Sequence, residues 1–398
     1  MRSVLLVSPW AHRPGHYWIN TSNLAAALAG CGLRVSVLTL FEPLGVVRLP
    51  PNVRHYVVLG PKCRLLRGLL GKTGCLNGLL QQAACLAFAA RKGLLRGADL
   101  IHFTDASPLL ATAFALCRRR AVMCTLLGPP EAGPGWARSV IGRTIKTILQ
   151  RGAAAVVALT GRVGFVCETE EIRAQWAKLF REHVHVVPYA ICTPQVKPDR
   201  WEARLRLGLS TSAPVFLLFG TQRPSKDYET VLQAAVRCSS EPILLFVGKY
   251  ISGPMPGEIA KHVGCKHVRI VDEFVPEEQL PLYFAAADAT ILPYSGPYDK
   301  GSGVLLLACK WQVPVIATDT AYFRRFFQLY PVGHLYPSGD IERLATIMDL
   351  FADPAHATTF HSALTRAATA HSWQAALPRY LSLYELYLPA AHEATQTS

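Results

Sequence analysis

The loop that follows an apolar run near the middle of the chain carries two cations spaced to meet phosphates. The run VFLLFG (residues 215–220) is typical of a strand, and Gly220, Arg223 and Lys226 stand in the segment GTQRPSK at its end. Glycine lets the backbone approach a ligand closely, and two cations three residues apart can meet two phosphates. A solvated basic loop has the same composition, so the motif indicates a phosphate site only together with the motifs around it.

A second loop could complete an anion site. The strand-like end LPY is followed by Gly301, Ser302 and Gly303, and a short helix is expected to start there. The first turn of a helix presents free N–H groups and the positive end of the helix dipole, which favour an anion. The pattern Gly-Ser-Gly is by itself an ordinary turn. Here, however, it is the second loop in this half of the chain that follows a strand and is suited to an anion.

The two motifs, in this order, resemble the donor-binding half of the retaining GT-B glycosyltransferases of family 4. Members often read glycine, two residues, Arg-Pro, one residue and Lys after the first strand of this domain, and GTQRPSK fits that spacing. Some members carry a Ser-Gly-Val loop after a Leu-Pro-Tyr strand end, matched here by Ser302-Gly303-Val304 after Leu292-Pro293-Tyr294. The segment FVPEEQLPLYFAAADATILPY between them is similar as well. The resemblance covers nearly the whole chain, most closely after Pro188.

The resemblance implies transfer of a sugar from a UDP- or GDP-sugar to an acceptor hydroxyl on a glycan or lipid-linked molecule, with retention of configuration. Stabilising the leaving diphosphate and the oxocarbenium-like sugar is electrostatic work. It is assigned to Arg223, Lys226 and the amides of Gly303 and Val304, without a metal, because the chain has no Asp-x-Asp motif. No cofactor is expected besides the nucleotide-sugar co-substrate. The donor-binding set implied by the resemblance also includes Gly220, Phe274, Val275, Tyr294, Gly301 and Ser302.

Two departures from the family pattern bear on activity. Many members have Thr-x-His at the end of a first-domain strand, where this chain has Leu127 in place of the histidine. Many also have two glutamates eight positions apart, which here fall on Asp299 and Leu307 or, in a second alignment, on Lys300 and Ala308. Asp299 is the expected acceptor of hydrogen bonds from sugar hydroxyls. Two other functions stay open: a catalytically silent GT-B protein that binds a nucleotide sugar or a partner, and a sugar-nucleotide epimerase.

The first half holds the candidate acceptor-side residues. Gly15 and His16 lie in AHRPGHYW, between the first expected strand and the first helix, where glycine permits close backbone approach. His102 and Asp105 follow a strand in ADLIHFTDASP, where family members often place an active-site histidine or acid. An exposed loop histidine, or polar residues that cap the next helix, explain the same pattern. His102 and Asp105 join Arg223, Lys226 and Asp299 as the predicted catalytic residues.

The elements that must position these residues alternate along the chain. Strand-like runs are SVLLVSP, LRVSVLTL, ADLIHF, AVMCTLL, AAAVVAL and VGFVCE, separated by helical stretches at residues 19–33 and 109–119. This α/β alternation predicts two doubly wound parallel-sheet domains, residues 1–190 for the acceptor and 191–370 for the donor, with ligand at the carboxyl ends of the strands. By the resemblance, the final helix, capped by Ser372, packs back on the first domain with residues 371–398.

Length and composition fit a protein of two or three domains that does not cross a membrane. Apolar residues make up 51% and mean hydropathy is +0.22, yet no apolar run reaches the ~18 residues of a membrane span. The N-terminal run MRSVLLVSPW suits a first buried strand better than a signal peptide. Eleven cysteines without a C-x-x-C pair indicate reduced thiols, and hence a cytoplasmic protein.

Positive charge is concentrated in the first half. Residues 1–190 hold 23 Lys and Arg against 8 Asp and Glu, whereas residues 191–398 hold 18 against 19. From Pro43 to Ala98 there are nine cations and no acid, and a helix with Arg64 and Arg67 beside leucines would be basic and amphipathic. Such a helix predicts peripheral association with the anionic inner face of a cell membrane, although a core-facing helix with a basic outer side fits equally. Nucleic acid is not an expected partner, since no binding motif is found.

Overall fold

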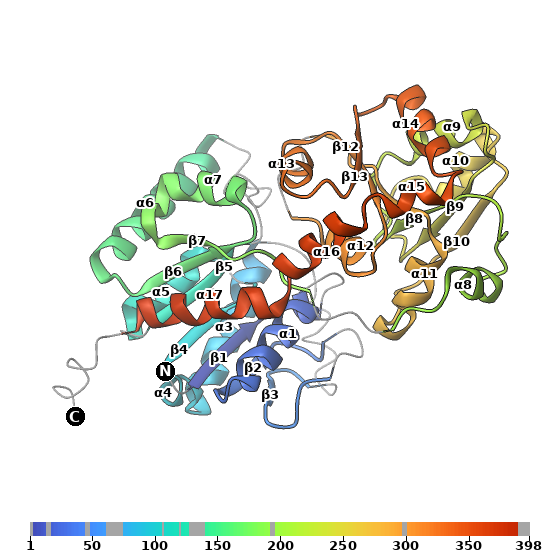
Figure 1. Ribbon diagram of the computed structural model, residues 1–398. Coiled ribbons are helices and arrows are strands. Elements are labelled where there is room, and N and C mark those ends of the chain that lie inside the picture. The colour runs from blue at the N-terminus through green and yellow to red at the C-terminus, as the bar shows by residue number, and fades with distance from the viewer. Residues whose placement is uncertain are drawn as a thin grey trace. The chain divides into compact units, whose positions relative to one another are not determined.

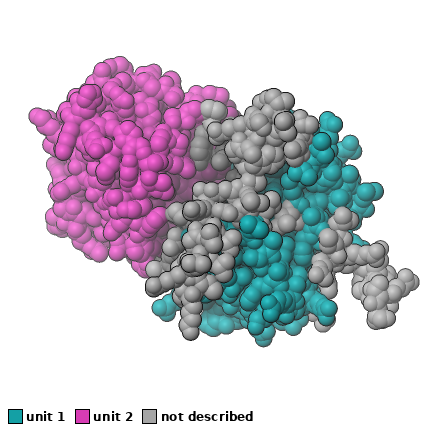
Figure 2. Space-filling model, turned by 180° about the vertical axis from the view of Figure 1, so that it is seen from behind, with its two compact units in different colours: residues 1–188, 376–398 teal, residues 189–375 magenta. Residues whose placement is uncertain are grey.

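The computed structural model describes residues 3–12, 17–43, 48–60, 75–105, 107–118, 121–126, 140–191, 196–296 and 301–388. The chain forms two compact units, residues 1–188 with 376–398 and residues 189–375 (Figure 2). Each unit is an α/β domain around one parallel sheet (Figure 1).

Unit 1 contains a seven-stranded parallel sheet in the order β3-β2-β1-β4-β5-β6-β7. The strands are β1 Ser3–Ser8, β2 Arg34–Thr39, β3 Arg54–Val57, β4 Leu100–Phe103, β5 Ala121–Leu126, β6 Val163–Cys167 and β7 Val184–Val186. The helices are α1 Tyr17–Gly30, α3 Cys75–Arg91, α4 Leu94–Gly97, α5 Pro108–Arg118, α6 Val140–Thr160, α7 Glu170–Phe180 and α17 Trp373–Tyr387, and a short 3₁₀ turn spans Arg181–His183.

One predicted strand of unit 1 is wrong. The run AAAVVAL, residues 153–159, forms the last two turns of α6. Its alanines favour a helix. Ala153 and Val157 lie four residues apart on the face that packs into the core, as helical periodicity requires. This packing outweighs the β propensity of the valines. This strand apart, each predicted strand of the first half coincides with an observed one.

The two faces of this sheet are covered by different helices. Alternate strand residues such as Leu5, Ile101 and Phe165 form one core cluster with buried residues of α3, α5, α6 and α7. The opposite face receives α17, because the Tyr384 hydroxyl lies 2.6 Å from Nδ1 of His102 on β4. The Tyr387 hydroxyl, on the same helix, lies 2.8 Å from Nε2 of His185 on β7. Two buried tyrosines therefore hold the C-terminal helix to the N-terminal sheet.

Unit 2 contains a six-stranded parallel sheet in the order β10-β9-β8-β11-β12-β13. The strands are β8 Val215–Phe219, β9 Ile243–Val247, β10 Val268–Val271, β11 Ala289–Leu292, β12 Val315–Thr318 and β13 Gly333–Tyr336. The helices are α8 Arg200–Arg206, α9 Tyr228–Arg237, α10 Pro256–Val263, α11 Leu280–Ala286, α12 Gly303–Lys310, α13 Ala321–Leu329, α14 Ile341–Leu350, α15 Pro354–Thr358 and α16 His361–Ala370, with a 3₁₀ turn at Glu277–Gln279.

A buried ion pair fixes α8 against the start of this sheet. Arg204 is fully buried and its guanidinium lies 2.5 Å from one oxygen of Asp288, while Arg200 lies 2.6 Å from the other. The same carboxylate accepts the N–H of Val215 at 2.7 Å, at the first residue of β8. This arrangement sets where β8 begins, and so where the loop at its far end emerges.

Candidate active site

The strand order of unit 2 reverses between β8 and β11, and the two predicted motifs lie at that reversal. Strands β9 and β10 extend the sheet on one side of β8, and β11 to β13 extend it on the other. Helices that leave opposite faces at such a switch point open a crevice at the carboxyl ends of the strands, where α/β sheets bind ligands. Gly220 follows β8 and Pro293-Tyr294 follow β11, so both loops emerge at the carboxyl ends of neighbouring strands at this reversal.

Hydrogen bonds join the two loops directly. The N–H of Asp227 donates to the carbonyl of Pro293 at 2.6 Å, and the N–H of Ser295 donates to the carbonyl of Ser225 at 3.0 Å. Lys226 and Tyr294 thereby form an isolated antiparallel bridge, and the Tyr294 ring stacks on Phe323 with 5.7 Å between centroids. Motifs nearly 70 residues apart in sequence thus form one structural unit.

Gly220, Lys226 and Val304 converge at the floor of this site. Gly220 has φ of 90°, and a Cβ added there would lie 3.3 Å from Cγ2 of Val304 and 3.8 Å from Nζ of Lys226. Glycine is required by the left-handed backbone and leaves room beside the ammonium group. The left-handed backbone at this strand end therefore calls for glycine, and Val304 and Lys226 lie beside it.

Lys226 is buried with a single hydrogen bond acceptor. Its side chain is 7% exposed, and Nζ donates to the carbonyl of Phe219 at 2.8 Å. Burial, and after it the nearby charge of Arg223, lowers the pKa of Lys226 to about 7. No carboxylate contributes to this shift among the described residues, so the ammonium lacks a negative partner that an anionic ligand would supply.

The N-terminus of α12 completes the site. Ser302 is buried and caps the helix, its Oγ accepting the N–H of Leu305 at 3.3 Å. The backbone N–H of Ser302 lies 3.4 Å from the Tyr322 hydroxyl, which holds the loop against α13. Capped in this way, the first turn of α12 starts at Gly303 and Val304, and Val304 is the residue that faces Gly220. The arrangement suits a diphosphate between an ammonium group and first-turn amides.

A further glycine, Gly248, was missed by the sequence analysis. It follows β9 with φ of 139°, and a Cβ there would lie 2.3 Å from the carbonyl oxygen of Gly220. The ends of β8 and β9 can approach this closely only because Gly248 has no side chain. The sequence indicates this glycine by the pattern FVG, an apolar strand followed by glycine, which is the same as the pattern LFG at the end of β8.

The remaining donor-side residues occupy different surroundings. Arg223 is exposed, and Phe274, 55% exposed, follows β10 with Val275 half-buried beside it. A large exposed aromatic ring at a strand end is suited to stack on a nucleobase. Gly301 is half-buried just before the cap of α12. Asp299 and Lys300 lie outside the described residues.

The positions where the family often has a second glutamate are apolar and partly or fully buried. Leu307 packs against the apolar core of unit 2. Ala308 is fully buried in the same cluster. Neither residue can accept a hydrogen bond with its side chain, so neither can supply the ribose contact that the resemblance implies at these positions.

His102 has structural partners on both ring nitrogens. The side chain is fully buried, Nδ1 lies 2.6 Å from the Tyr384 hydroxyl and Nε2 lies 2.8 Å from Oγ1 of Thr125. Burial lowers its pKa to about 3, so the ring is neutral. These contacts give His102 a role in attaching α17 to β4 and β5, and leave no ring nitrogen open to a substrate.

Asp105 likewise holds the backbone together. Its side chain is 1% exposed, and one oxygen accepts the hydroxyl of Ser8 at 2.7 Å and the N–H of Trp10 at 3.2 Å. Gln81 accepts the indole N–H of Trp10 at 2.9 Å. The loops after β1 and β4 are therefore tied to each other and to α3.

Several predicted residues lie outside the described part of the chain. They are Gly15 and His16 of the predicted acceptor loop, Leu127, and the cations Arg64 and Arg67 of the predicted basic helix. Their predicted roles remain predictions.

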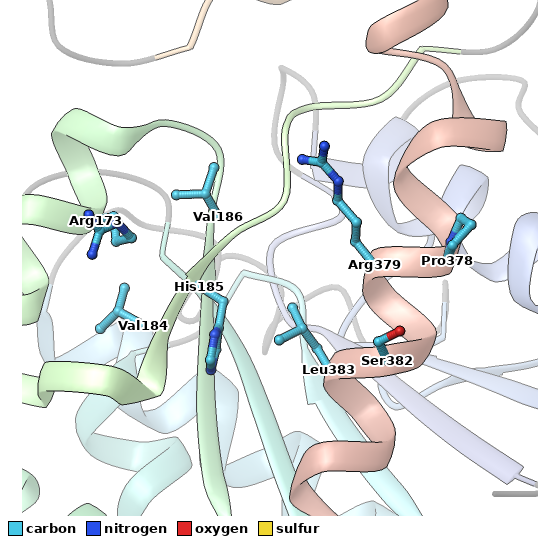
Figure 3. Close-up of a pocket in the computed structure, with 8 residues that line it drawn as sticks. All are labelled: Arg173, Val184, His185, Val186, Pro378, Arg379, Ser382 and Leu383. Carbon is cyan, nitrogen blue, oxygen red and sulfur yellow. The ribbon is translucent and has the colours of Figure 1, made fainter.

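An open hollow of about 580 Å³ lies elsewhere on unit 1, beside the edge strand β7 (Figure 3). It is lined by Arg173, Val184, His185, Val186, Pro378, Arg379, Ser382 and Leu383. Arg173 pairs with Glu170 at 2.5 Å, and His185 bonds to Tyr387. No predicted site residue lines this hollow.

Comparison with known proteins gives a family match within unit 2. Residues 199–363 match the family model described as glycosyl transferases group 1. The D-inositol 3-phosphate glycosyltransferase 1 of Catenulispora acidiphila is 26% identical over 250 residues, which cover 58% of this chain and 59% of that protein. The chain thus matches less than two thirds of the relative's length.

Solved structures match almost the whole chain. Sucrose-phosphate synthase from Thermosynechococcus elongatus superposes with a TM-score of 0.72 at 18% identity, covering 97% of this chain and 98% of that one. HepE from Anabaena, in complex with UDP and glucose, gives 0.68 at 14% identity, covering 97% and 100%. At these identities the likeness shows the fold, which is GT-B.

Proposed function

We propose that the protein is an active, retaining glycosyltransferase of family 4 that moves a sugar from a UDP- or GDP-sugar to an acceptor hydroxyl without a metal. The observation that carries the proposal is the buried ammonium of Lys226, which has no acidic partner in the described structure and faces Gly220 and Val304. A buried positive charge without a negative partner is unfavourable, and a bound anionic ligand would supply that partner. A nucleoside diphosphate has the charge and size to do so.

The chemistry follows from the groups at the site. As the bond between the anomeric carbon and the diphosphate breaks, negative charge grows on the leaving oxygen. Lys226, Arg223 and the first-turn amides of α12 stabilise that charge in a preorganised, partly dry site. Phe274 and Val275 are proposed to contact the nucleobase, and Asp299 the hydroxyls of the donor sugar. We propose no substrate contact for His102 or Asp105, whose contacts are structural.

The acceptor side is assigned to unit 1, with Gly15 and His16 in the loop after β1. The proposed acceptor is a glycan or a lipid-linked molecule that carries a free hydroxyl. The proposed location is the cytoplasm.

A silent protein that binds a nucleotide sugar is the second candidate. It is favoured by Leu307, which packs into the core where many family members have a glutamate. Slow donor hydrolysis separates the two candidates. An active enzyme should release UDP or GDP from at least one sugar in a panel of donors, and Arg223→Ala should reduce that rate about a hundredfold. Donor binding without any release by the wild-type protein would support the silent candidate.

A further inference from the structure

Four of the helices on one face of the unit 1 sheet carry no acidic residue. Helices α3, α4, α5 and α6 contain six Lys and Arg and no Asp or Glu. Buried residues of α3, α5 and α6 pack into one core cluster against the same sheet face. The outer sides of these four helices therefore carry no carboxylate, whereas α7, which packs on the same sheet face, has Glu170 and Glu171 in its first turn.

The outer face of α6 is apolar where a solvated helix should be polar. Its inner face packs through Ala153 and Val157. On the outer face Ile148 is 63% exposed and Leu159 85%, and Leu149, which lies in line with Ala153, is still 47% exposed. Ile148 and Leu159 are eleven residues apart, which places them on one side of the helix three turns from each other. An exposed cation, Arg151, lies one turn after Ile148.

Helix α3 has the same character. Cys85 and Ala89 are fully buried in the shared core cluster, while Leu80 on the outer side is 48% exposed. The helix ends at Arg91 and is followed by Lys92, and both side chains are exposed. The two helices together present aliphatic side chains with exposed cations near them, and no acid on either helix.

We propose that this outer face of α3 and α6 docks unit 1 on the surface of an anionic lipid bilayer. Aliphatic side chains enter the region between headgroups and acyl chains, while Arg91, Lys92 and Arg151 meet lipid phosphates. The helices would lie on the bilayer, because within the described residues no helix is long and apolar enough to cross it. The proposal does not depend on catalysis, since it concerns a surface made by unit 1 alone.

The side chains favour lipid over other partners. A nucleic acid that binds through stacked bases needs exposed aromatic rings, whereas the large exposed apolar residues of α3 and α6 are aliphatic. Protein interfaces are enriched in Tyr and Trp, and their charges are usually of both signs. Aliphatic residues beside cations of one sign match the interior and headgroups of an anionic bilayer.

Sedimentation of the full chain with vesicles tests the proposal. Wild type should bind vesicles that contain phosphatidylglycerol, bind neutral phosphatidylcholine vesicles at least about tenfold less, and dissociate as salt shortens the Debye length. The double variant Ile148→Ser, Leu159→Ser should lower the vesicle partition coefficient at least about tenfold. Arg151→Glu should lower it on anionic vesicles only.

Matched control variants lie on unit 2. Val236 and Leu329 are 51% and 60% exposed, so Val236→Ser, Leu329→Ser removes the same kind of surface from the other domain. Arg366→Glu is the matched charge reversal at an exposed site. These controls should bind vesicles as wild type does. Circular dichroism and UDP or GDP binding of each variant report whether the fold and the donor site are intact.

Three results would overturn the proposal. Wild type that fails to bind anionic vesicles at low salt excludes the lipid surface. Vesicle binding that survives in the α6 variants but is lost in the unit 2 controls places the contact on the other domain. Self-association that disappears in Ile148→Ser, Leu159→Ser, without lipid binding, would show that a second copy covers this face. Loss of donor hydrolysis with vesicle binding retained would count against the proposed function and not against this surface.

Discussion

Replacing Lys226 with methionine should make the protein more stable at acidic pH while removing donor affinity. The pKa of Lys226 is lowered from 10.5 to about 7 in the folded state. Between these values the unfolded chain binds a proton that the folded protein does not, so wild-type stability falls as pH drops from about 10 to about 7. Below pH 7 the full destabilisation is present.

The magnitude follows from the shift and one hydrogen bond. Each pKa unit corresponds to about 1.4 kcal/mol, so charging the buried amine destabilises the wild-type fold by roughly 4 to 5 kcal/mol at pH 6 as an upper bound. Methionine has a similar length and no charge, but it loses the hydrogen bond to the Phe219 carbonyl, which contributes about 1 kcal/mol. Lys226→Met should therefore raise the free energy of unfolding by about 3 kcal/mol at pH 6.

Urea unfolding at pH 6 and pH 10 measures this difference. At pH 10 the variant should be within about 1 kcal/mol of wild type, because most of the penalty for charging Lys226 is then gone and the lost hydrogen bond offsets the remainder. Arg223→Met, at an exposed site, should show no such pH-dependent gain. A Lys226→Met protein that is less stable than wild type by the same amount at both pH values would refute the reasoning.

Three other outcomes follow from the structure. Tyr384→Phe removes the hydroxyl that contacts Nδ1 of buried His102. The free energy of unfolding, measured by heat or urea, should fall by about 1 to 3 kcal/mol. An unchanged unfolding midpoint would mean that the contact is not made in solution. Gly248→Ala places a Cβ against the Gly220 carbonyl, so the ends of β8 and β9 must separate. UDP or GDP binding should weaken at least about tenfold. Affinity equal to that of wild type would show that the two strand ends can separate without cost. Donor hydrolysis should continue in EDTA, since cations and amides stabilise the leaving group, and full loss of the rate with recovery in magnesium would contradict the metal-free site.

The donor half could be predicted well because its signals are local. The residues at strand ends and helix starts in this half are Gly220, Lys226 and Ser302. At such positions glycine permits a left-handed backbone, lysine supplies a positive charge and serine caps a helix, whatever the rest of the fold. The sequence did not reveal that Lys226 is buried or that its loop bonds to Pro293. Those facts depend on strand order, which local patterns do not encode.

The first half shows why long-range contacts limit such reasoning. His102 has the pattern of a cleft histidine, yet its partner Tyr384 lies 282 residues away on α17. No local signal distinguishes a histidine that meets substrate from one that meets a distant hydroxyl. The run 153–159 was predicted as a strand because its valines suit either structure, and only its packing in α6 decides.

Proton uptake on nucleotide binding tests the central claim most directly. Titration calorimetry of wild type with UDP and with GDP at pH 8, in buffers of different ionisation enthalpy, counts the protons bound with the ligand. With a free pKa of about 7, Lys226 is mostly neutral at pH 8 and must become charged to meet a diphosphate. We predict uptake of close to one proton by wild type for the nucleotide that binds, and no uptake by Lys226→Met in any binding that remains. Tight binding by wild type without proton uptake, or equal uptake by both proteins, would contradict a diphosphate site built on Lys226.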